Sequence, residues 1–156
     1  MSAHRLLSGI AVWCALGLFG GSASGQLAVI PVHGLTFGTL TPGVPLAVPV
    51  TDAARRAEFS ISGSGTYVLT FNLPSQLVSA GGRTLPISFN SSSGRAVWNN
   101  FGITYNFDPR TPYSLWLFFL AGGARVYLGG TASPSPSQAP GNYTATIRLV
   151  VSNAGT

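Results

Sequence analysis

Charged side chains and cysteine are scarce in this chain. Only 7% of the residues are charged, the acids number three, and the cations are eight arginines with no lysine. Apart from the adjacent Arg55 and Arg56, the arginines stand alone and do not form the basic stripe that nucleic-acid binding needs. Nucleic acid is therefore not an expected partner. Sparse charges of this kind serve to keep a largely uncharged surface in solution.

The side chains that carry catalysis are also few. Beyond residue 25 the chain has one histidine, His33, and three dispersed acids, Asp52, Glu58 and Asp108. A Ser–His–Asp triad would have to use His33, and a pair of catalytic carboxylates would have to come from these acids. One histidine and scattered acids also make a poor metal-ligand set. We expect no enzyme, no cofactor and no metal site.

The only cysteine, Cys14, lies in an apolar run at the N-terminus. Residues 1–5 form a short basic start, residues 6–20 are apolar, and residues 21–25 are small. This order is typical of a secretory signal peptide, and the run is short for a membrane span. We expect cleavage after Gly25 or after Ala23, with an uncleaved membrane anchor as the alternative. The mature chain would then be secreted or displayed at the cell surface, without stable membrane insertion.

Removal of the signal would leave a chain without cysteine, which cannot form a disulfide even in an oxidising compartment. Core burial and strand pairing must then hold the domain together, and a chain of this length can bury enough surface for one domain. Gly (20) and Pro (11) are abundant and separate many short apolar runs. The pattern predicts an all-β fold, an immunoglobulin-like β-sandwich of about seven or eight strands. Its domain would cover residues 35–156, after an N-terminal extension over residues 26–34.

Alternation of apolar and polar residues sets the expected strands. Ala57, Phe59 and Ile61, for example, alternate with polar neighbours. Residues 90–100 are expected to be a polar loop around Trp98, and the apolar run 115–120 a strand covered on both faces. The expected strands cover residues 35–40, 57–62, 67–73, 85–89, 103–107, 115–120, 125–130 and 143–151, and residues 44–50, broken by two prolines, are expected to be an edge segment.

The final expected strand carries the strongest pattern. A Pro-Gly-Asn turn at residues 140–142 precedes it. After it, only a short polar stretch follows in this sequence, so we expect one side of the strand to lack a covering neighbour. The sandwich is therefore predicted to be incomplete, with an exposed edge. The residues on its inward face are Tyr143, Ala145, Ile147, Leu149 and Val151.

Four blocks resemble those of secreted spore-coat-protein-U-like domains and the related archaic chaperone–usher pilins. They are Leu-Thr-Phe-Gly-Thr-Leu at 35–40, Ala-Glu-Phe-Ser-Ile-Ser-Gly at 57–63, Tyr-Leu-Gly-Gly-Thr at 127–131, and Gln-Ala-Pro-Gly-Asn-Tyr-Thr at 138–144. The resemblance implies a sandwich that lacks one strand, which the N-terminal segment of a neighbouring subunit supplies. It also implies a head-to-tail homo-oligomeric filament for adhesion or surface coating, with a periplasmic chaperone and an usher as partners.

On this resemblance, residues 26–33 are the donor strand. One register points Ala28, Ile30 and Val32 inward and is favoured because Pro31 then faces outward; the other points Leu27, Val29 and Pro31 inward. Alternatively, residues 27–33 fold back and complete their own sandwich, which would give a monomer. The residues expected to line the acceptor groove are Leu35, Phe37, Ile147, Leu149 and Val151.

A second hypothesis is a monomeric secreted module that binds carbohydrate. Exposed aromatic rings can stack on sugars, and Trp98, Tyr113 and Trp116 are the candidates.

Overall fold

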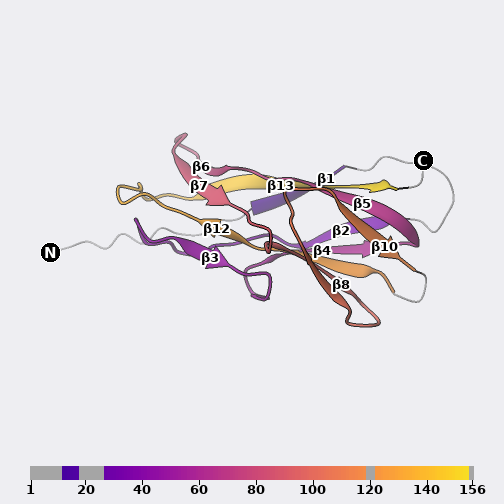
Figure 1. Ribbon diagram of the computed structural model, residues 1–156. Coiled ribbons are helices and arrows are strands. Elements are labelled where there is room, and N and C mark those ends of the chain that lie inside the picture. Colours follow the sequence, from indigo (N-terminus) through magenta and orange to yellow (C-terminus); the bar gives the residue numbers. More distant parts are fainter. Residues whose placement is uncertain (1–11, 18–26, 119–121, 155–156) are drawn as a thin grey trace.

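The computed structural model describes residues 12–17, 27–118 and 122–154 of the chain. All of the regular secondary structure in these ranges is β-strand, and the strands form two sheets packed face to face (Figure 1). The predicted all-β sandwich is confirmed. Within the same ranges, no helix could cross a membrane.

The first sheet contains the last strand near its middle. The strand β1 (Val12–Gly17) pairs with β13 outside the main path of this sheet. The main path runs in the spatial order β10 (Tyr113–Leu117), β5 (Gly65–Asn72), β13 (Tyr143–Asn153), β6 (Gln76–Ser79), β7 (Thr84–Ser88), β12 (Gly130–Ala132) and β3 (Leu46–Val48).

The second sheet is antiparallel throughout, and β2 and β9 form its edges. The core lies between the sheets, where the Phe59 ring meets the Phe71 ring edge-on at 5.9 Å. Its spatial order is β2 (Ala28–His33), β4 (Ala57–Ser62), β11 (Ala124–Leu128), β8 (Gly94–Trp98) and β9 (Thr104–Phe107).

Strict alternation explains the strands that the sequence located correctly. In β4 the three apolar residues are fully buried, while the residues between them are partly exposed. Because successive side chains of a strand point to opposite faces, this pattern matches one face packed on the core. The expected strand at residues 57–62 is therefore confirmed.

Three expectations are wrong, and the first is the strand at residues 35–40. Residues 35–40 form no strand beyond an isolated bridge at Thr36, whose N–H donates to the Arg55 carbonyl at 2.8 Å. Gly38 takes a φ of 66°, which ends the extended conformation there. Leu35 and Phe37 are nevertheless buried in the core.

The expected polar loop at residues 90–100 contains β8. Two of its three inward positions, Gly94 and Ala96, are small, and a Cβ on Gly94 would lie 2.6 Å from the Phe107 ring. Trp98 is only 7% exposed, and its Nε1 donates to the Trp116 carbonyl at 2.8 Å. In the expected run 115–120, residues 119 and 120 lie outside the described part of the chain. Over residues 115–118 the run is not covered on both faces, because Trp116 is 60% exposed.

The start of β13 is fixed by a buried hydroxyl. The Tyr143 side chain is fully buried, and its Oη donates to the Ala139 carbonyl at 2.7 Å. The same oxygen accepts from Gln138 Nε2 at 2.8 Å, and this amide also donates to the Thr84 carbonyl at 3.1 Å. Tyr143 and Gln138 together therefore tie the turn before β13 to the start of β7.

We predict that Tyr143→Phe lowers the free energy of unfolding by about 1–2 kcal/mol, because it leaves buried polar partners unsatisfied without changing the ring. Urea unfolding followed by fluorescence measures this loss. The exposed Tyr105 gives a matched control, since Tyr105→Phe should change stability little. Equal stability of Tyr143→Phe and the parent chain would contradict the assigned role of the hydroxyl.

Candidate functional site

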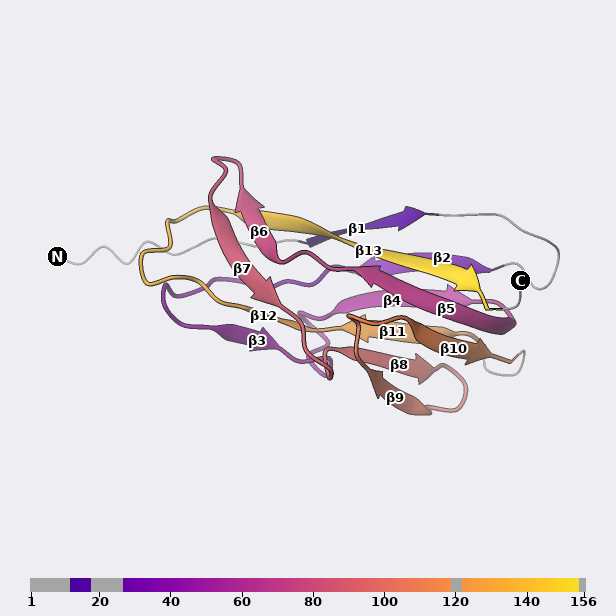
Figure 2. The ribbon, with the colours of Figure 1, turned by 45° about the horizontal axis from the view of Figure 1, so that its top comes forward.

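The candidate site is the flank of β13 that faces away from β5. On the β5 side, β13 pairs antiparallel over Arg148–Asn153. On the other side, β6 pairs only with Tyr143 and Thr144. The next six residues, from Ala145 to Val150, pair there with β1, which runs parallel to β13 (Figure 2). The flank over these residues thus depends on β1 for its backbone hydrogen bonds.

The inward face of β13 is apolar along this flank. Ile147 and Leu149 are buried, and Ala145 and Val151 are partly buried against the core. The residues between them, Thr144, Thr146 and Arg148, are exposed. A strand that lies on this flank, as β1 does, therefore pairs with the backbone of β13 beside the edge of the apolar core, which is the arrangement that strand addition exploits.

The structure places the other expected groove residues differently. Leu35 and Phe37 lie in the core on a segment without a ladder of its own. Leu35 instead packs close to Gly130 of β12. A Cβ atom added to Gly130 would lie only 3.2 Å from Leu35 Cδ2. The element that contacts β1 across the gap between the sheets is β2. The opposite rim of the flank is therefore the edge of the second sheet.

Residues 28–33, expected to be spare, pair with β4 of their own chain as β2. In this position Val29 is buried, whereas Ile30 is 58% exposed and Val32 is 52% exposed. Within its own chain, the segment therefore points Val29 inward, whereas the inward set of Ala28, Ile30 and Val32 is predicted for donation to another chain. The physical reason is the pairing of Val29 with the buried Ile61, which fixes the face. Donation to another chain stays a prediction.

The three acids of the chain are each paired with arginine. Asp52 binds Arg55 at 2.7 Å, and Glu58 binds Arg125. His33 stands opposite Glu58 in the β2–β4 ladder, but the hydrogen bond of its ring is made elsewhere, between Nδ1 and the Arg56 carbonyl at 2.9 Å. In the ranges that the structure describes, no group of His, Cys, Asp and Glu could hold a metal ion.

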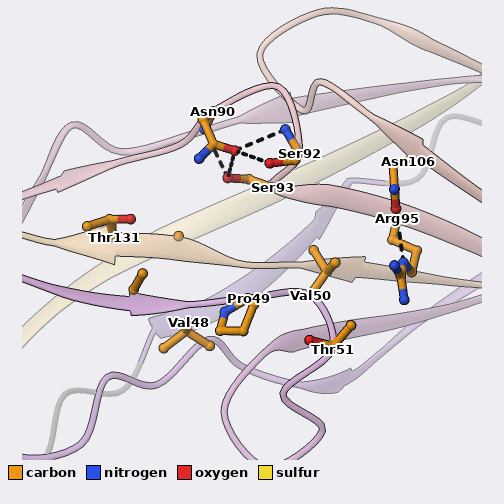
Figure 3. A pocket seen from close by; sticks show the side chains of 12 residues that line it. Val48, Pro49, Val50, Thr51, Asn90, Ser92, Ser93, Arg95, Asn106 and Thr131 are labelled. Carbon is orange, nitrogen blue, oxygen red and sulfur yellow. Dashed lines mark hydrogen bonds between the residues drawn. The ribbon is translucent and has the colours of Figure 1, made fainter.

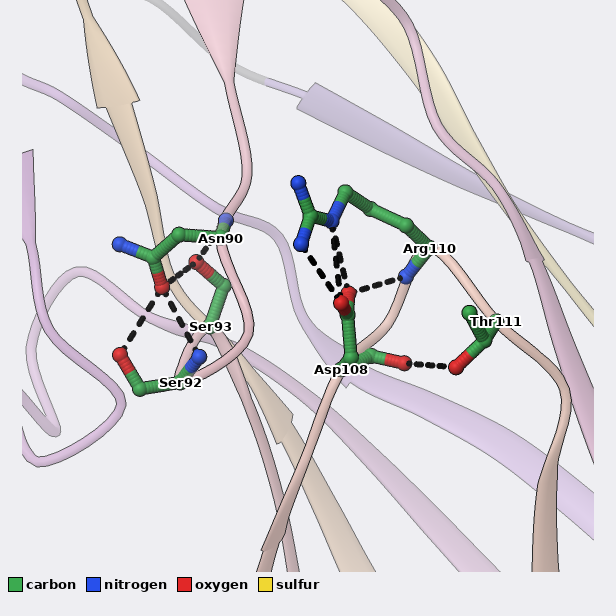
Figure 4. A network of polar contacts seen from close by, with 6 residues as sticks. All are labelled: Asn90, Ser92, Ser93, Asp108, Arg110 and Thr111. Atoms are coloured by element: carbon green, nitrogen blue, oxygen red, sulfur yellow. Dashed lines mark hydrogen bonds and ion pairs between the residues drawn. The ribbon is translucent and has the colours of Figure 1, made fainter.

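The acid Asp108 illustrates these pairs. Its carboxylate accepts from Arg110 Nη2 at 2.6 Å and from the Arg110 N–H at 2.9 Å within a turn (Figure 4). This hydrogen bonding from Arg110 lowers the Asp108 pKa to about 2. A neighbouring turn is closed by Asn90, whose Oδ1 accepts from the hydroxyls of Ser92 and Ser93. Both networks are local turn contacts.

An open pocket of about 300 Å³ lies beside β3 and β12 (Figure 3). On its rim Arg95 Nε donates to Asn106 Oδ1 at 3.0 Å. The pocket has polar groups but no acid or histidine to transfer a proton. Its lining residues are Ala47, Val48, Pro49, Val50, Thr51, Asn90, Ser92, Ser93, Arg95, Asn106, Gly130 and Thr131.

Aromatic rings gather around β10 and the β8–β9 turn. The Phe118 ring lies 5.0 Å from Trp116 and 5.2 Å from Phe101, and these three form what we call the aromatic strip. Trp116 and Phe101 are exposed. Of the three predicted sugar contacts, Trp98 is buried, Tyr113 stacks on Phe107 at 4.3 Å, and only Trp116 is strongly exposed. Burial raises the pKa of the Tyr113 hydroxyl, with a smaller contribution from Tyr105.

A scan against models of known protein families gave no match, and a search of curated proteins gave none. The site is therefore interpreted from its own geometry.

We predict that Asp108 contributes to the acid unfolding of the domain. Its folded-state pKa of about 2 lies below the usual 3.8, so its stabilising contribution is complete above about pH 4 and is lost as pH falls through about 2. Urea midpoints from pH 5 to pH 2 should show Asp108→Asn less stable than the parent at pH 5 and equal to it near pH 2.

Arg110→Gln serves as the matched control. It removes the partner of Asp108, so the urea midpoint should depend less on pH over the same range. A constant difference between Asp108→Asn and the parent across this range would rule out the ion pair as the cause.

Proposed function

We propose that the chain is an exported structural subunit that assembles head to tail into an extracellular filament by strand donation, for adhesion or surface coating. The observation that supports the proposal most is the pairing of Ala145–Val150 with β1. All of β1 lies in the apolar run of the predicted signal peptide. Once that segment is cut away, six residues in the middle of the longest strand have no partner on one flank.

Removal of β1 would leave backbone groups of β13 that another strand can pair with. Buried backbone N–H and C=O groups are almost always paired, and an open edge beside a core is a template for strand addition. Ile147 and Leu149 present apolar side chains at the same place. We call the flank of β13 over Ala145–Val150 the acceptor flank. A contact between the acceptor flank of one copy and a donor strand of the next copy does not close on itself, so it propagates as a filament.

The donor in this proposal is the segment 26–33 of the next subunit. As β2 it is weakly held at the edge of its own sheet, since Val29 is its one buried residue and the ladder shifts register between Pro31 and His33. Pro31 lacks an N–H, which weakens the pairing further. The exposed Ile30 and Val32 give the segment an apolar side that its own sandwich does not use.

We predict that the chain from Gln26 to Thr156 forms filaments, visible by electron microscopy, and that Ala145→Lys keeps it monomeric. Ala145 pairs with β1 and is partly buried, so a lysine there puts a charge on the inward side of the acceptor flank. Thr146→Lys is the matched control, because Thr146 is exposed on the same flank and its variant should still assemble.

A stable monomer of the chain 26–156 at all concentrations would refute the filament. The donor is identified by deleting residues 26–33, because a labelled peptide of that sequence should then bind the shortened chain. Such a peptide could also bind at the edge of β4 that the deletion exposes. The variant Ala145→Lys distinguishes the two sites, because it should abolish only the peptide binding at the acceptor flank.

The aromatic strip supports a second candidate function, the recognition of polysaccharide. Its specific support is Trp116, whose ring is 60% exposed although its strand is part of the core. Rings held against one another lose little freedom on binding, and exposed aromatic clusters often mark interaction sites. The candidate residues on β10 and the β8–β9 turn are thus Trp116, Phe118 and Phe101 in place of the buried Trp98.

We predict that Trp116→Ala abolishes any signal that the parent chain gives on a glycan array. Its ring is exposed, so the variant should remain folded. Val78→Ala is the control, since Val78 is an exposed apolar residue on another strand and its loss should leave binding unchanged. The absence of binding by the parent chain would dismiss this second function.

A further inference from the structure

The pocket beside β3 and β12 lies where the chain passes from one sheet to the other. β11 ends at Leu128 in the second sheet, and β12 begins at Gly130 in the first. Gly129 makes the passage, because its N–H donates to the Ser93 carbonyl at 2.8 Å and a Cβ there would clash with the Val48 carbonyl oxygen. A chain that changes sheets makes a corner of the sandwich, and the pocket of about 300 Å³ lies at this corner.

One end of the pocket carries an oriented guanidinium group. Arg95 of β8 and Asn106 of β9 stand opposite one another, and Arg95 Nε donates to Asn106 Oδ1 at 3.0 Å (Figure 3). This bond uses Nε and leaves the two terminal NH₂ groups of Arg95 for a ligand. A planar guanidinium held in this way matches a carboxylate, which can accept two parallel hydrogen bonds from it.

A second arginine adds positive charge beside the pocket. Arg56 Nη1 donates to the carbonyl of Val50, a residue of the pocket wall, at 2.9 Å. The Arg56 guanidinium also lies 3.5 Å from the centre of the Tyr127 ring, and Tyr127 stands opposite Arg95 in the β8–β11 ladder. Two arginines therefore flank one tyrosine next to the pocket.

The nearby acids are engaged elsewhere. Asp52 directly follows the wall residue Thr51, but its carboxylate binds Arg55 at 2.7 Å. Glu58 also binds other arginines. Among the residues that the structure describes, no acid lines the pocket and no ion pair includes Arg95. The lining thus has one cation without a carboxylate, which matches a ligand with one negative charge.

Neutral hydrogen-bonding groups line another part of the pocket. Asn90 Oδ1 accepts from the N–H and the hydroxyl of Ser92, both at 2.9 Å, and from the Ser93 hydroxyl at 3.0 Å. These bonds fix the amide, so that Nδ2 and its two donors are turned away from Ser92 (Figure 3). Thr51 and Thr131 add hydroxyl groups to the lining. Such donors and acceptors fit the hydroxyl groups of a sugar.

We propose that this pocket binds a uronic-acid residue of an acidic polysaccharide. Arg95 holds the carboxylate, Asn90 and Thr131 hydrogen-bond to the sugar hydroxyls, and Pro49 supplies an apolar surface for the C–H face of the ring. Ligand pockets range from about 300 to 1,000 Å³, and this one fits a single sugar. The inference does not rest on strand donation, because none of these residues lies on β2 or β13.

Titration of the full chain with sodium D-glucuronate, followed by ligand-observed NMR, measures this binding. D-glucose and sodium acetate are the matched ligands, because the first lacks the carboxylate and the second lacks the sugar. Glucuronate should bind at least about tenfold more tightly than either, since charge-assisted hydrogen bonds are the stronger ones.

Substitutions locate the site. Arg95→Gln should weaken glucuronate binding at least about tenfold, and the variant should stay folded because Arg95 is partly exposed. Arg83→Gln is the matched control: it removes the same charge from the exposed β6–β7 turn, outside the pocket, and should leave binding unchanged. Thr131→Val keeps the side-chain shape and gives a second variant that does not alter charge; it should weaken binding about two- to tenfold.

Four results would overturn the proposal. The first is the absence of glucuronate binding by the parent chain. The second is equal weakening by Arg83→Gln and Arg95→Gln, which would show a general attraction to a basic protein. The third is displacement of glucuronate by an equal concentration of inorganic phosphate, which would show that the pocket recognises an anion without its sugar. The fourth is loss of binding in Trp116→Ala, which would move the sugar to the aromatic strip.

Discussion

The backbone pairing on both sides of β13 is the constraint on which the rest of the structure depends. This strand has eleven residues and joins β5 to β6 in the first sheet. Its inward residues Ile147 and Leu149 are buried between the layers. If one flank of β13 were unpaired, backbone hydrogen-bonding groups and core side chains would be exposed together. A strand inside the sheet therefore requires a partner on each flank.

The scarcity of charge and cysteine fits this reading of the domain. No disulfide can lock the edges of a chain whose single cysteine lies in β1. Asp52 and Asp108 pair with arginines within turns, and Glu58 pairs with Arg125 on the neighbouring strand β11. The arginine side chains of these pairs are exposed, and pairs of this kind contribute little to stability compared with core burial. Strand pairing and core burial remain as the main stabilising interactions, and both can be supplied by an exchanged strand.

The sequence predicted those parts of the fold where large apolar residues alternate. The strands β4 and β13 are of this kind, and so the inward burial of Ile147 and Leu149 was predicted correctly from periodicity. β8 was missed because its inward residues Gly94 and Ala96 are small and carry no apolar signal. The partner of β13 was out of reach for another reason: Val12 and Ala145 are far apart in the chain, and local patterns do not specify which distant strands pair.

Hydrogen exchange at Ala145, Thr146 and Ile147 tests the central claim most directly. These residues pair with β1 and lie before the β5 ladder begins. Successive N–H groups of a strand point to opposite flanks. The amides of this stretch that point toward β1 should therefore exchange far faster in the dilute monomer of the chain 26–156 than those of the β5 ladder, and they should become protected in the full chain and in filaments. Strong protection of these amides in the isolated monomer would contradict an open acceptor flank.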